Sequence, residues 1–295
     1  MENNNIVLLF DGIGEIIDES ILEKNFEISQ MFQEEYEEYR TFIEKEIFKY
    51  NKAEKQDGII WDWIKKYIYD YCMYQKWKPD MNVSYVLPYS MGLITALVCL
   101  DGISFETGIK IIITSYYYTL NKQEDMLMLM VVGYNKEELQ NSIHKHCEEN
   151  TVFEAADIGH NYILLSGLKK SIDILIPLLI EGGAIKVNPI TTPVAYHTKF
   201  AQVNIDEFAK VIDSIEVRDI TTPICSLYSN QYINKSCDLK HELVVNLYSK
   251  MNVTACIEKL KRDGNRVFFE IGATKSLYKI YRRMDEEIQI LKNLH

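Results

Sequence analysis

The fold of this chain is decided by residues 83–92, VSYVLPYSMG, in which an apolar, strand-like segment runs directly into Ser90. Gly92 follows two residues later, and residues 93–100 then have the apolar character of a buried helix. A strand, a sharp turn and a helix in this order are typical of a nucleophile elbow, which raises a serine hydroxyl above a sheet and points the first helical amides at the atom under attack. Pro88 stands where the G-x-S-x-G pattern has its first glycine, so a serine that only caps a helix is the competing interpretation.

The composition is that of a globular protein that does not depend on nucleic acid. The chain has 295 residues, of which 47% are hydrophobic and 25% charged, and its formal net charge of -11 argues against nucleic acid as the main partner. No apolar run is long enough to span a bilayer, and the first residues lack the pattern of a secretory signal. The six cysteines are scattered without a C-x-x-C pair, so we expect no metal site, no disulfide framework and a cytoplasmic location.

The order of the predicted elements indicates a large α/β domain that is interrupted by a small one. Residues 6–10 form an apolar strand that ends in a glycine-bearing loop, and residues 19–76 have mostly helical spacing. Residues 126–189 then follow the order β-α-β-β-α-β, which is that of a ferredoxin-like unit. We therefore predict a large domain formed by residues 1–125 and 190–295, with a ferredoxin-like subdomain inserted between them.

A nucleophilic serine needs a base, and His197 is the best-placed histidine of the sequence. It stands in the segment TPVAYHT, residues 192–198, which forms a loop after the last strand of the inserted unit. Loops between subdomains are where binding pockets form. His144 and His146 lie two positions apart on a polar helix and do not share a face. Because spacing does not show that His197 meets Ser90, a structural histidine is the competing interpretation.

Five short segments in a fixed order resemble motifs of the malonyl-CoA:acyl-carrier-protein transacylase family. They are FDGIGE at residues 10–15, PYSMG at 88–92, VAYH at 194–197, SN at 229–230 and EIGATKSL at 270–277. The first, second and fifth correspond to the family patterns FPGQGSQ, GHSLG and EIGPGKVL, and the third contains the family histidine. The resemblance covers essentially the whole chain and implies an α/β-hydrolase-like large domain with an inserted ferredoxin-like small subdomain.

The resemblance also implies a set of catalytic residues. Ser90 corresponds to the nucleophile, and His197 corresponds to its general base and acid. Asn252 occupies the position whose backbone carbonyl orients the histidine, where other serine enzymes use an aspartate. The backbone amides of Ile13 and Met91 correspond to the oxyanion hole, and a backbone amide donates whichever side chain follows it.

Ser115 is the departure from the family that bears most on the substrate. Members that use malonyl groups have an arginine at this position, and its guanidinium pairs with the free carboxylate of the substrate. No arginine lies between Arg40 and Arg218 in this chain. A malonyl carboxylate buried without a cation is costly, so we expect malonyl-CoA to be a poor substrate and an uncharged acyl group to be a better one.

Further substitutions surround the elbow. Tyr89 replaces the histidine beside the nucleophile, and Pro88 replaces the first glycine. We expect Tyr89, Tyr196 and Gly12 to line the substrate pocket together with Ser115. The same substitutions also agree with a degenerate site, so the sequence leaves open whether catalysis occurs.

Three functions are compatible with these observations. Family members that lack the arginine include hydrolases that remove stalled acyl groups from carrier proteins in polyketide synthesis, so a proofreading acyl-thioester hydrolase is the first hypothesis. A transferase of an uncharged acyl group, such as acetyl, between coenzyme A and acyl carrier protein is the second. A catalytically degenerate partner that binds carrier protein is the third. The resemblance implies acyl carrier protein as the partner, acyl-CoA or a phosphopantetheinyl carrier protein as the substrate, no bound cofactor and a monomeric protein.

A basic cluster near the end of the sequence is a candidate docking surface. Its members are Lys275, Lys279, Arg282 and Arg283. Carrier proteins are typically acidic, so a local positive patch on an acidic enzyme would attract them. A solvated helix face is the competing interpretation.

Overall fold

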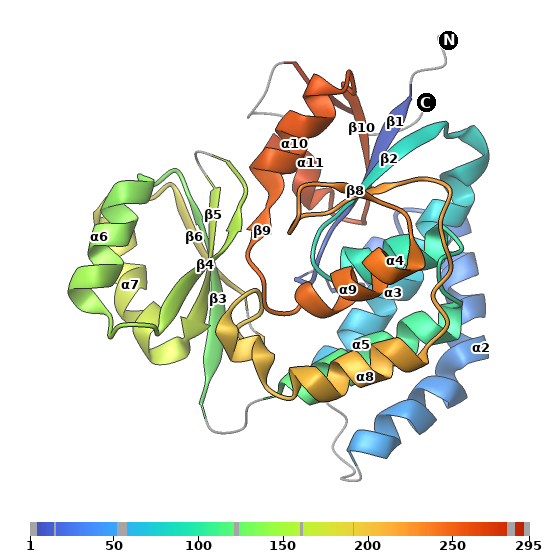
Figure 1. The fold of residues 1–295 in the computed structure, drawn as a ribbon, viewed down its shortest axis with the longest axis horizontal. Coiled ribbons are helices and arrows are strands. Elements are labelled where there is room, and N and C mark those ends of the chain that lie inside the picture. The colour runs from blue at the N-terminus through green and yellow to red at the C-terminus, as the bar shows by residue number, and fades with distance from the viewer. Residues whose placement is uncertain are drawn as a thin grey trace.

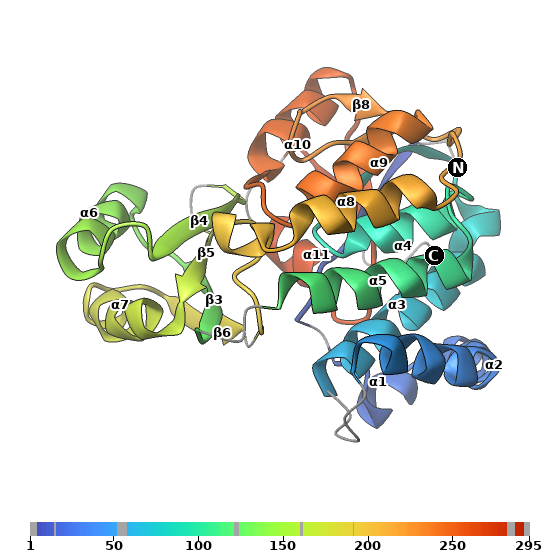
Figure 2. The same ribbon diagram turned by 60° about the horizontal axis from the view of Figure 1, so that its bottom comes forward.

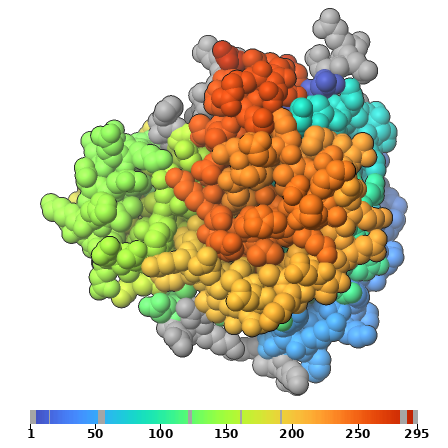
Figure 3. Space-filling view, in the orientation of Figure 1, coloured from blue at the N-terminus to red at the C-terminus, as the bar shows by residue number. Residues whose placement is uncertain are grey.

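The computed structural model describes residues 5–14, 16–51, 58–120, 124–159, 162–190, 192–281 and 287–291. They form a large lobe and a small lobe (Figure 1), and the space-filling view shows the small one, in light green, projecting from one side of the large one (Figure 3). This arrangement confirms the predicted α/β fold class with a smaller inserted subdomain. None of the helices in these ranges has the length and apolar composition of a membrane span.

A six-stranded sheet with the order β11-β10-β1-β2-β7-β8 is the framework of the large lobe. Its strands are, in chain order, β1 (Ile6–Phe10), β2 (Val83–Pro88), β7 (Ile224–Cys225), β8 (Tyr232–Ile233), β10 (Val267–Ile271) and β11 (Gln289–Leu291). β1 pairs in parallel with both β10 and β2, and only β8 runs antiparallel to its neighbour. All five residues of β1 are apolar and buried, as expected for a strand that is covered on both faces.

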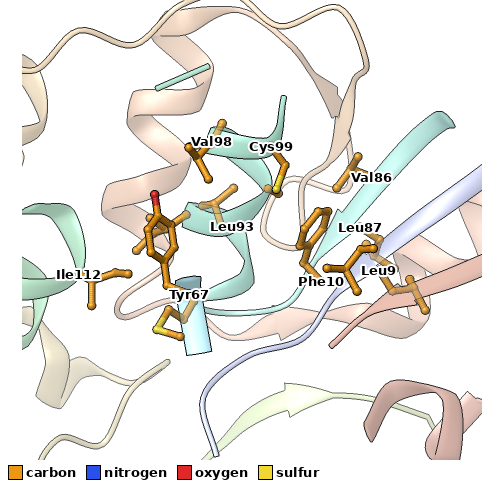
Figure 4. Packing of buried hydrophobic residues seen from close by; sticks show 14 of the residues in the cluster. Leu9, Phe10, Tyr67, Val86, Leu87, Leu93, Val98, Cys99 and Ile112 are labelled. Carbon is orange, nitrogen blue, oxygen red and sulfur yellow. The ribbon is translucent and has the colours of Figure 1, made fainter. Parts of the chain in front are cut away.

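Helices pack around this sheet (Figure 2). They are α1 (Glu19–Leu22), α2 (Phe26–Tyr50), α3 (Gly58–Trp77), α4 (Gly92–Cys99), α5 (Phe105–Thr119), α8 (Ile205–Ser214), α9 (Ser236–Val245), α10 (Val253–Arg262) and α11 (Ser276–Tyr281), with short 3-10 turns η1 (Lys78–Asp80) and η2 (Lys199–Gln202). All eight residues of α4 are buried. Figure 4 shows the core near this helix, where Leu93 and Cys99 of α4 lie with Phe10 of β1 and Val86 of β2. The elbow helix is therefore held by the centre of the large core.

The small lobe has its own sheet and its own core. Its elements are β3 (Met126–Val132), α6 (Lys136–His146), β4 (Val152–Asp157), β5 (Tyr162–Leu168), α7 (Lys169–Glu181) and β6 (Lys186–Ile190). The four strands pair in the antiparallel order β6-β3-β5-β4, and Leu129, Val131 and Leu175 belong to a separate hydrophobic cluster. The sheet has a fifth strand that we did not predict, β9 (Met251–Asn252), which pairs in parallel with β4. A segment near the end of the chain thus joins the two lobes.

Candidate active site

Ser90 lies in a sharp turn between β2 and α4. Its φ angle is +54°, in the left-handed region that a residue with a side chain rarely adopts. The turn is fixed by the Tyr89 amide, which donates to the Phe10 carbonyl at 2.7 Å, and by the Asn246 carboxamide, which donates to the Ser90 carbonyl at 3.2 Å. A Cβ atom on Gly92 would lie 2.5 Å from the Phe10 carbonyl oxygen, so glycine is required where β1 approaches α4.

Pro88 does not disturb this turn. It is the last residue of β2, in register with Phe10 of β1. The pairing of β2 with its other neighbour, β7, occurs at Val86, before the proline. A strand end tolerates the missing N–H of proline, so the elbow forms without the usual first glycine.

The structure brings His197 to Ser90, although 107 positions separate them. Their Nε2 and Oγ atoms lie 2.9 Å apart. His197 also has a left-handed backbone, with φ of +61°, and its amide donates to the Leu247 carbonyl at 2.8 Å. On the other side of the ring, Nδ1 lies 3.3 Å from the Ser249 carbonyl oxygen. A carbonyl only accepts, so Nδ1 bears the proton and Nε2 is free to accept from the serine hydroxyl.

Burial lowers the pKa of His197 to about 4, against a smaller opposing effect of the Ser249 carbonyl. The ring is therefore neutral near pH 7, which is the protonation state that a general base requires. A carbonyl partner gives this histidine its orientation without a negative charge that would favour the imidazolium form.

The expectation that Asn252 supplies this carbonyl is wrong. The oxygen at Nδ1 is that of Ser249, three positions earlier. Asn252 is instead engaged in β9, where it pairs with Asp157 of β4 and its amide donates to the Leu227 carbonyl at 2.8 Å. Asn252 then forms the N-cap of α10.

The first turn of α4 leaves an amide available beside Ser90. The amides of Gly92, Leu93 and Ile94 donate to carbonyls three positions earlier. Within the described part of the chain, the Met91 amide donates to no protein acceptor, and this amide follows the serine directly. An unpaired amide here is what an oxyanion site needs.

The loop after β1 packs against the serine. A Cβ atom on Gly12 would lie 3.0 Å from the Ser90 Cβ, so Gly12 permits this close approach. The neighbouring residue, Ile13, lines the space around Ser90. The proposed contribution of its amide to an oxyanion hole stays a prediction.

A buried ionic cluster lies under this loop, and our sequence reasoning did not include it. The Lys66 ammonium contacts the carboxylates of both Asp11 and Asp70, and all three side chains are at most 5% exposed. The Ser276 hydroxyl donates to Asp11 at 3.1 Å and to Glu270 at 3.3 Å. Burial raises the pKa of Glu270 to about 7, with a further contribution from the Asp11 charge. The sequence feature that could have predicted this cluster is a lysine and an aspartate four positions apart on a mostly apolar helix.

Two spaces meet at Ser90 and Ile13. A cleft of about 560 Å³ lies between the sheet of the small lobe and the loop after β1, and His197, Tyr89 and Gly12 line it. A cavity of about 30 Å³ lies on the side of α3 and α5, and Ser115 and Tyr196 line it. The four residues expected at the substrate pocket thus divide between the cleft and the cavity.

The basic cluster is only partly as expected. Lys279 lines the cleft together with Lys186 of β6. Lys275 is engaged internally, because its ammonium bonds the Glu270 carbonyl and lies 4.5 Å from the Phe269 ring centroid. Arg282 and Arg283 lie outside the described residues.

Comparison with curated proteins gives distant relatives. The chain is 23% identical to the malonyl CoA-acyl carrier protein transacylase of Bacillus subtilis over 214 residues, which are 69% of this chain and 65% of that protein. It is 24% identical to the protein of the same name from Haemophilus influenzae over 228 residues, which are 74% of this chain and 72% of that protein. The matched relatives are thus malonyl CoA-acyl carrier protein transacylases, which this chain resembles along most of its length. No family model matches it, and the matched segment spans just under two thirds of the Bacillus subtilis transacylase.

Solved transacylase structures share the fold. The malonyl CoA-acyl carrier protein transacylase of Coxiella burnetii superposes with a TM-score of 0.80 at 17% identity, over 98% of this chain and 93% of that one. A type II PKS malonyl-transacylase in complex with its acyl-carrier protein superposes with a TM-score of 0.77 at 18% identity, over 97% and 95% of the two chains. The two-lobed arrangement is therefore that of the transacylases.

Proposed function

We propose that this protein forms an acyl-serine intermediate from the thioester of an acyl carrier protein or of coenzyme A. The 2.9 Å contact between Ser90 Oγ and His197 Nε2 is the observation that supports this most. Ser90 Oγ bonds to the thioester carbonyl carbon while Nε2 accepts the hydroxyl proton. The Met91 amide, with that of Ile13, stabilises the resulting oxyanion. When the intermediate collapses, the C–S bond breaks and His197 returns the proton to the departing thiolate.

Water is the proposed acceptor in the second step. It attacks the acyl-serine carbonyl while His197 accepts one of its protons, and the C–O bond to Ser90 breaks as that proton returns to the serine. The product is a free acid, so the protein would remove stalled acyl groups from carrier proteins in polyketide synthesis. The absence of the family arginine favours this role, because members without it include such hydrolases. No bound cofactor is needed, since the thioester itself activates the acyl group.

A thiol acceptor is the second candidate, and the cleft is the observation that favours it. Its volume of about 560 Å³ is in the range of small-molecule sites and leaves room for a phosphopantetheine arm. A carrier thiol in place of water would make the protein a transferase of an uncharged acyl group.

The lining of the cavity supports an uncharged acyl group. None of the described residues that line the cavity beside Ser90 is charged. A malonyl carboxylate there would lose its hydration without gaining a cation, which costs several kcal/mol. Lys186 and Lys279 at the cleft agree with an acidic carrier protein as the partner. The enzyme is proposed to be monomeric and cytoplasmic.

Intact-mass spectrometry tests the proposal directly. The protein is mixed with acetyl-, malonyl- and longer acyl-carrier-protein thioesters, with and without a second free carrier protein, and Ser90→Ala is the control. We expect a transient acetyl adduct that disappears as free acid and is missing in Ser90→Ala. Passage of the acyl group to the second carrier protein would establish the transferase, and an adduct from malonyl alone would contradict the uncharged substrate. No adduct from any donor would favour a degenerate carrier-binding protein.

A further inference from the structure

The cavity beside Ser90 is small. Its volume is about 30 Å³, and Ser90 and Met91 form part of its wall. Each water-sized group needs roughly 10–15 Å³ of such volume, so the cavity accepts about two of them. An acyl group on Ser90 Oγ, with its oxygen toward the Met91 amide and the carrier arm in the larger cleft that Ser90 also lines, would extend its alkyl carbons into this cavity. The other walls include Trp63, Ile94, Ile112 and Ser115.

Trp63 is the largest side chain at the cavity, and neighbouring rings hold it in place. Its indole meets the Tyr116 ring edge-on, with centroids 5.3 Å apart and an interplanar angle of 87°. It also lies 5.8 Å from the Tyr196 ring, whose hydroxyl is 3.1 Å from that of Thr119. Close-packed aromatic rings do not move aside without repacking their neighbours. Trp63 is therefore a rigid wall.

Polar side chains at the other walls are bonded within the protein. The Asn246 carboxamide donates to the Ser90 carbonyl and accepts from the Tyr228 hydroxyl. The Ser115 hydroxyl donates to the Ile112 carbonyl of its own helix at 2.9 Å, so its proton is turned away from the cavity. Ile94 and Ile112 are apolar and buried. The space therefore suits a short alkyl group and not a polar or charged one.

We propose that Trp63 restricts the acyl group to acetyl or propionyl. This inference rests on the proposed function, because it concerns the acyl chain of the Ser90 intermediate. A butyryl or longer chain exceeds the space of about 30 Å³ and meets the indole. Displacing the indole would break its contacts with both Tyr116 and Tyr196.

The experiment compares acyl chain lengths in wild-type protein and two tryptophan variants. The probes are acetyl, propionyl, butyryl and hexanoyl thioesters of N-acetylcysteamine, and intact-mass spectrometry gives the initial rate of adduct formation. In wild type we expect acetyl and propionyl to react at least about tenfold faster than hexanoyl. Trp63→Leu should raise the hexanoyl-to-acetyl ratio by about tenfold. Trp61→Leu is the matched control, since Trp61 lies on the same helix at the same 9% exposure and packs on Tyr36 away from the cavity.

Equal wild-type rates for acetyl and hexanoyl would overturn the inference. So would a Trp63→Leu protein that keeps its acetyl rate and its wild-type ratio, or a Trp61→Leu protein with the same rise in ratio. If Trp63→Leu does not fold, Ser115→Leu tests the cavity in the opposite direction. It should slow propionyl relative to acetyl by about tenfold, and an unchanged ratio would contradict the proposal. No adduct from any thioester in wild type would instead overturn the proposed function, and this inference with it.

Discussion

The ammonium group of Lys66 forms a buried ion pair with Asp11 and thereby links α3 to the loop after β1. Asp11 directly precedes Gly12, which packs on Ser90. The pair is almost completely removed from solvent, with 1% and 5% of the two side chains exposed. The position of this loop beside the nucleophile therefore depends on a charge contact between the FDGIGE segment and a lysine that belongs to none of the expected motifs.

Lys66→Met should destabilise the protein strongly. The substitution leaves the Asp11 and Asp70 carboxylates buried without their cation, and removing one partner of a buried pair typically costs about 3–5 kcal/mol. Urea unfolding measures the loss. Lys65→Met is the control. Lys65 is next to Lys66 on the same helix but is partly exposed, so its substitution should change the free energy of unfolding by about 0.5 kcal/mol or less. Equal effects of the two variants would show that the buried pair is unimportant.

The acylation rate should be insensitive to pH down to unusually acidic conditions. Because the pKa of His197 is lowered from 6.5 to about 4, the ring stays neutral and able to accept a proton as the pH falls through 6.5. Stopped-flow acylation by an acetyl thioester would check this, and a decline centred near the ordinary histidine pKa would contradict it. His197→Ala should slow acylation by about a thousandfold or more. His241→Ala, at an exposed position of α9, should have the wild-type rate.

The same histidine should make the fold less stable in acid. The unfolded chain binds a proton at its ordinary histidine pKa of 6.5, whereas the folded chain resists protonation until about 4. Stability is therefore lost as the pH falls between these values, by roughly 3 kcal/mol for this group. Thermal unfolding of wild type and His197→Gln over this range would check the sign, since the variant should lack this part of the loss.

Glu242→Gln should stabilise the protein at alkaline pH. Burial raises the pKa of Glu242 to about 7, although the Ser226 hydroxyl donates to its Oε2 at 2.8 Å. A raised carboxyl pKa means that its contribution to stability is present below the unfolded value and declines as the pH rises toward 7. A glutamine keeps an acceptor for Ser226 and removes that decline, so we expect a gain of about 2 kcal/mol at pH 8 and little change in acid. Glu258→Gln, at an exposed position of α10, should show no such difference between the two conditions.

Gly92→Ala should distort the elbow. The added Cβ would lie 2.5 Å from the Phe10 carbonyl oxygen and 2.6 Å from that of Asp11, and backbone atoms cannot give way as a flexible side chain does. We expect a loss of about 2 kcal/mol or more in unfolding free energy and slower acylation. Gly58→Ala is the control, because nothing lies within 4 Å of its added Cβ. Similar losses in the two variants would mean that the close approach of β1 is not what requires glycine at position 92.

The sequence predicted best what depends on local order. The strand, turn and helix around Ser90 are neighbours in the chain, and the alternation of elements in residues 126–190 follows from hydrophobic periodicity. Periodicity gave no indication of β9, because two residues are too short to show a repeat. The path of the chain after α9 determines which carbonyl faces His197. The resemblance assigned this role to Asn252, three positions after Ser249.

Other parts of the site depend on tertiary packing. Lys66 and Asp11 are 55 positions apart, and nothing in their spacing shows that they meet. Trp63 looks like any core aromatic in the sequence, and only the folded cavity places it near Ser90. The sequence shows that Ser115 stands where the family has an arginine. The small volume of the cavity beside it is a property of the packed structure.

β9 has a mechanical consequence. Met251 pairs with Ala156 in the small lobe, and Ser249, whose carbonyl faces the histidine, lies only two residues before it. Because only Lys250 stands between Ser249 and Met251, a rotation of the small lobe would act directly on the carbonyl that orients the imidazole. The small-lobe wall of the cleft is therefore coupled to the orientation of His197. A ligand that pushes the two lobes apart would also misalign this imidazole.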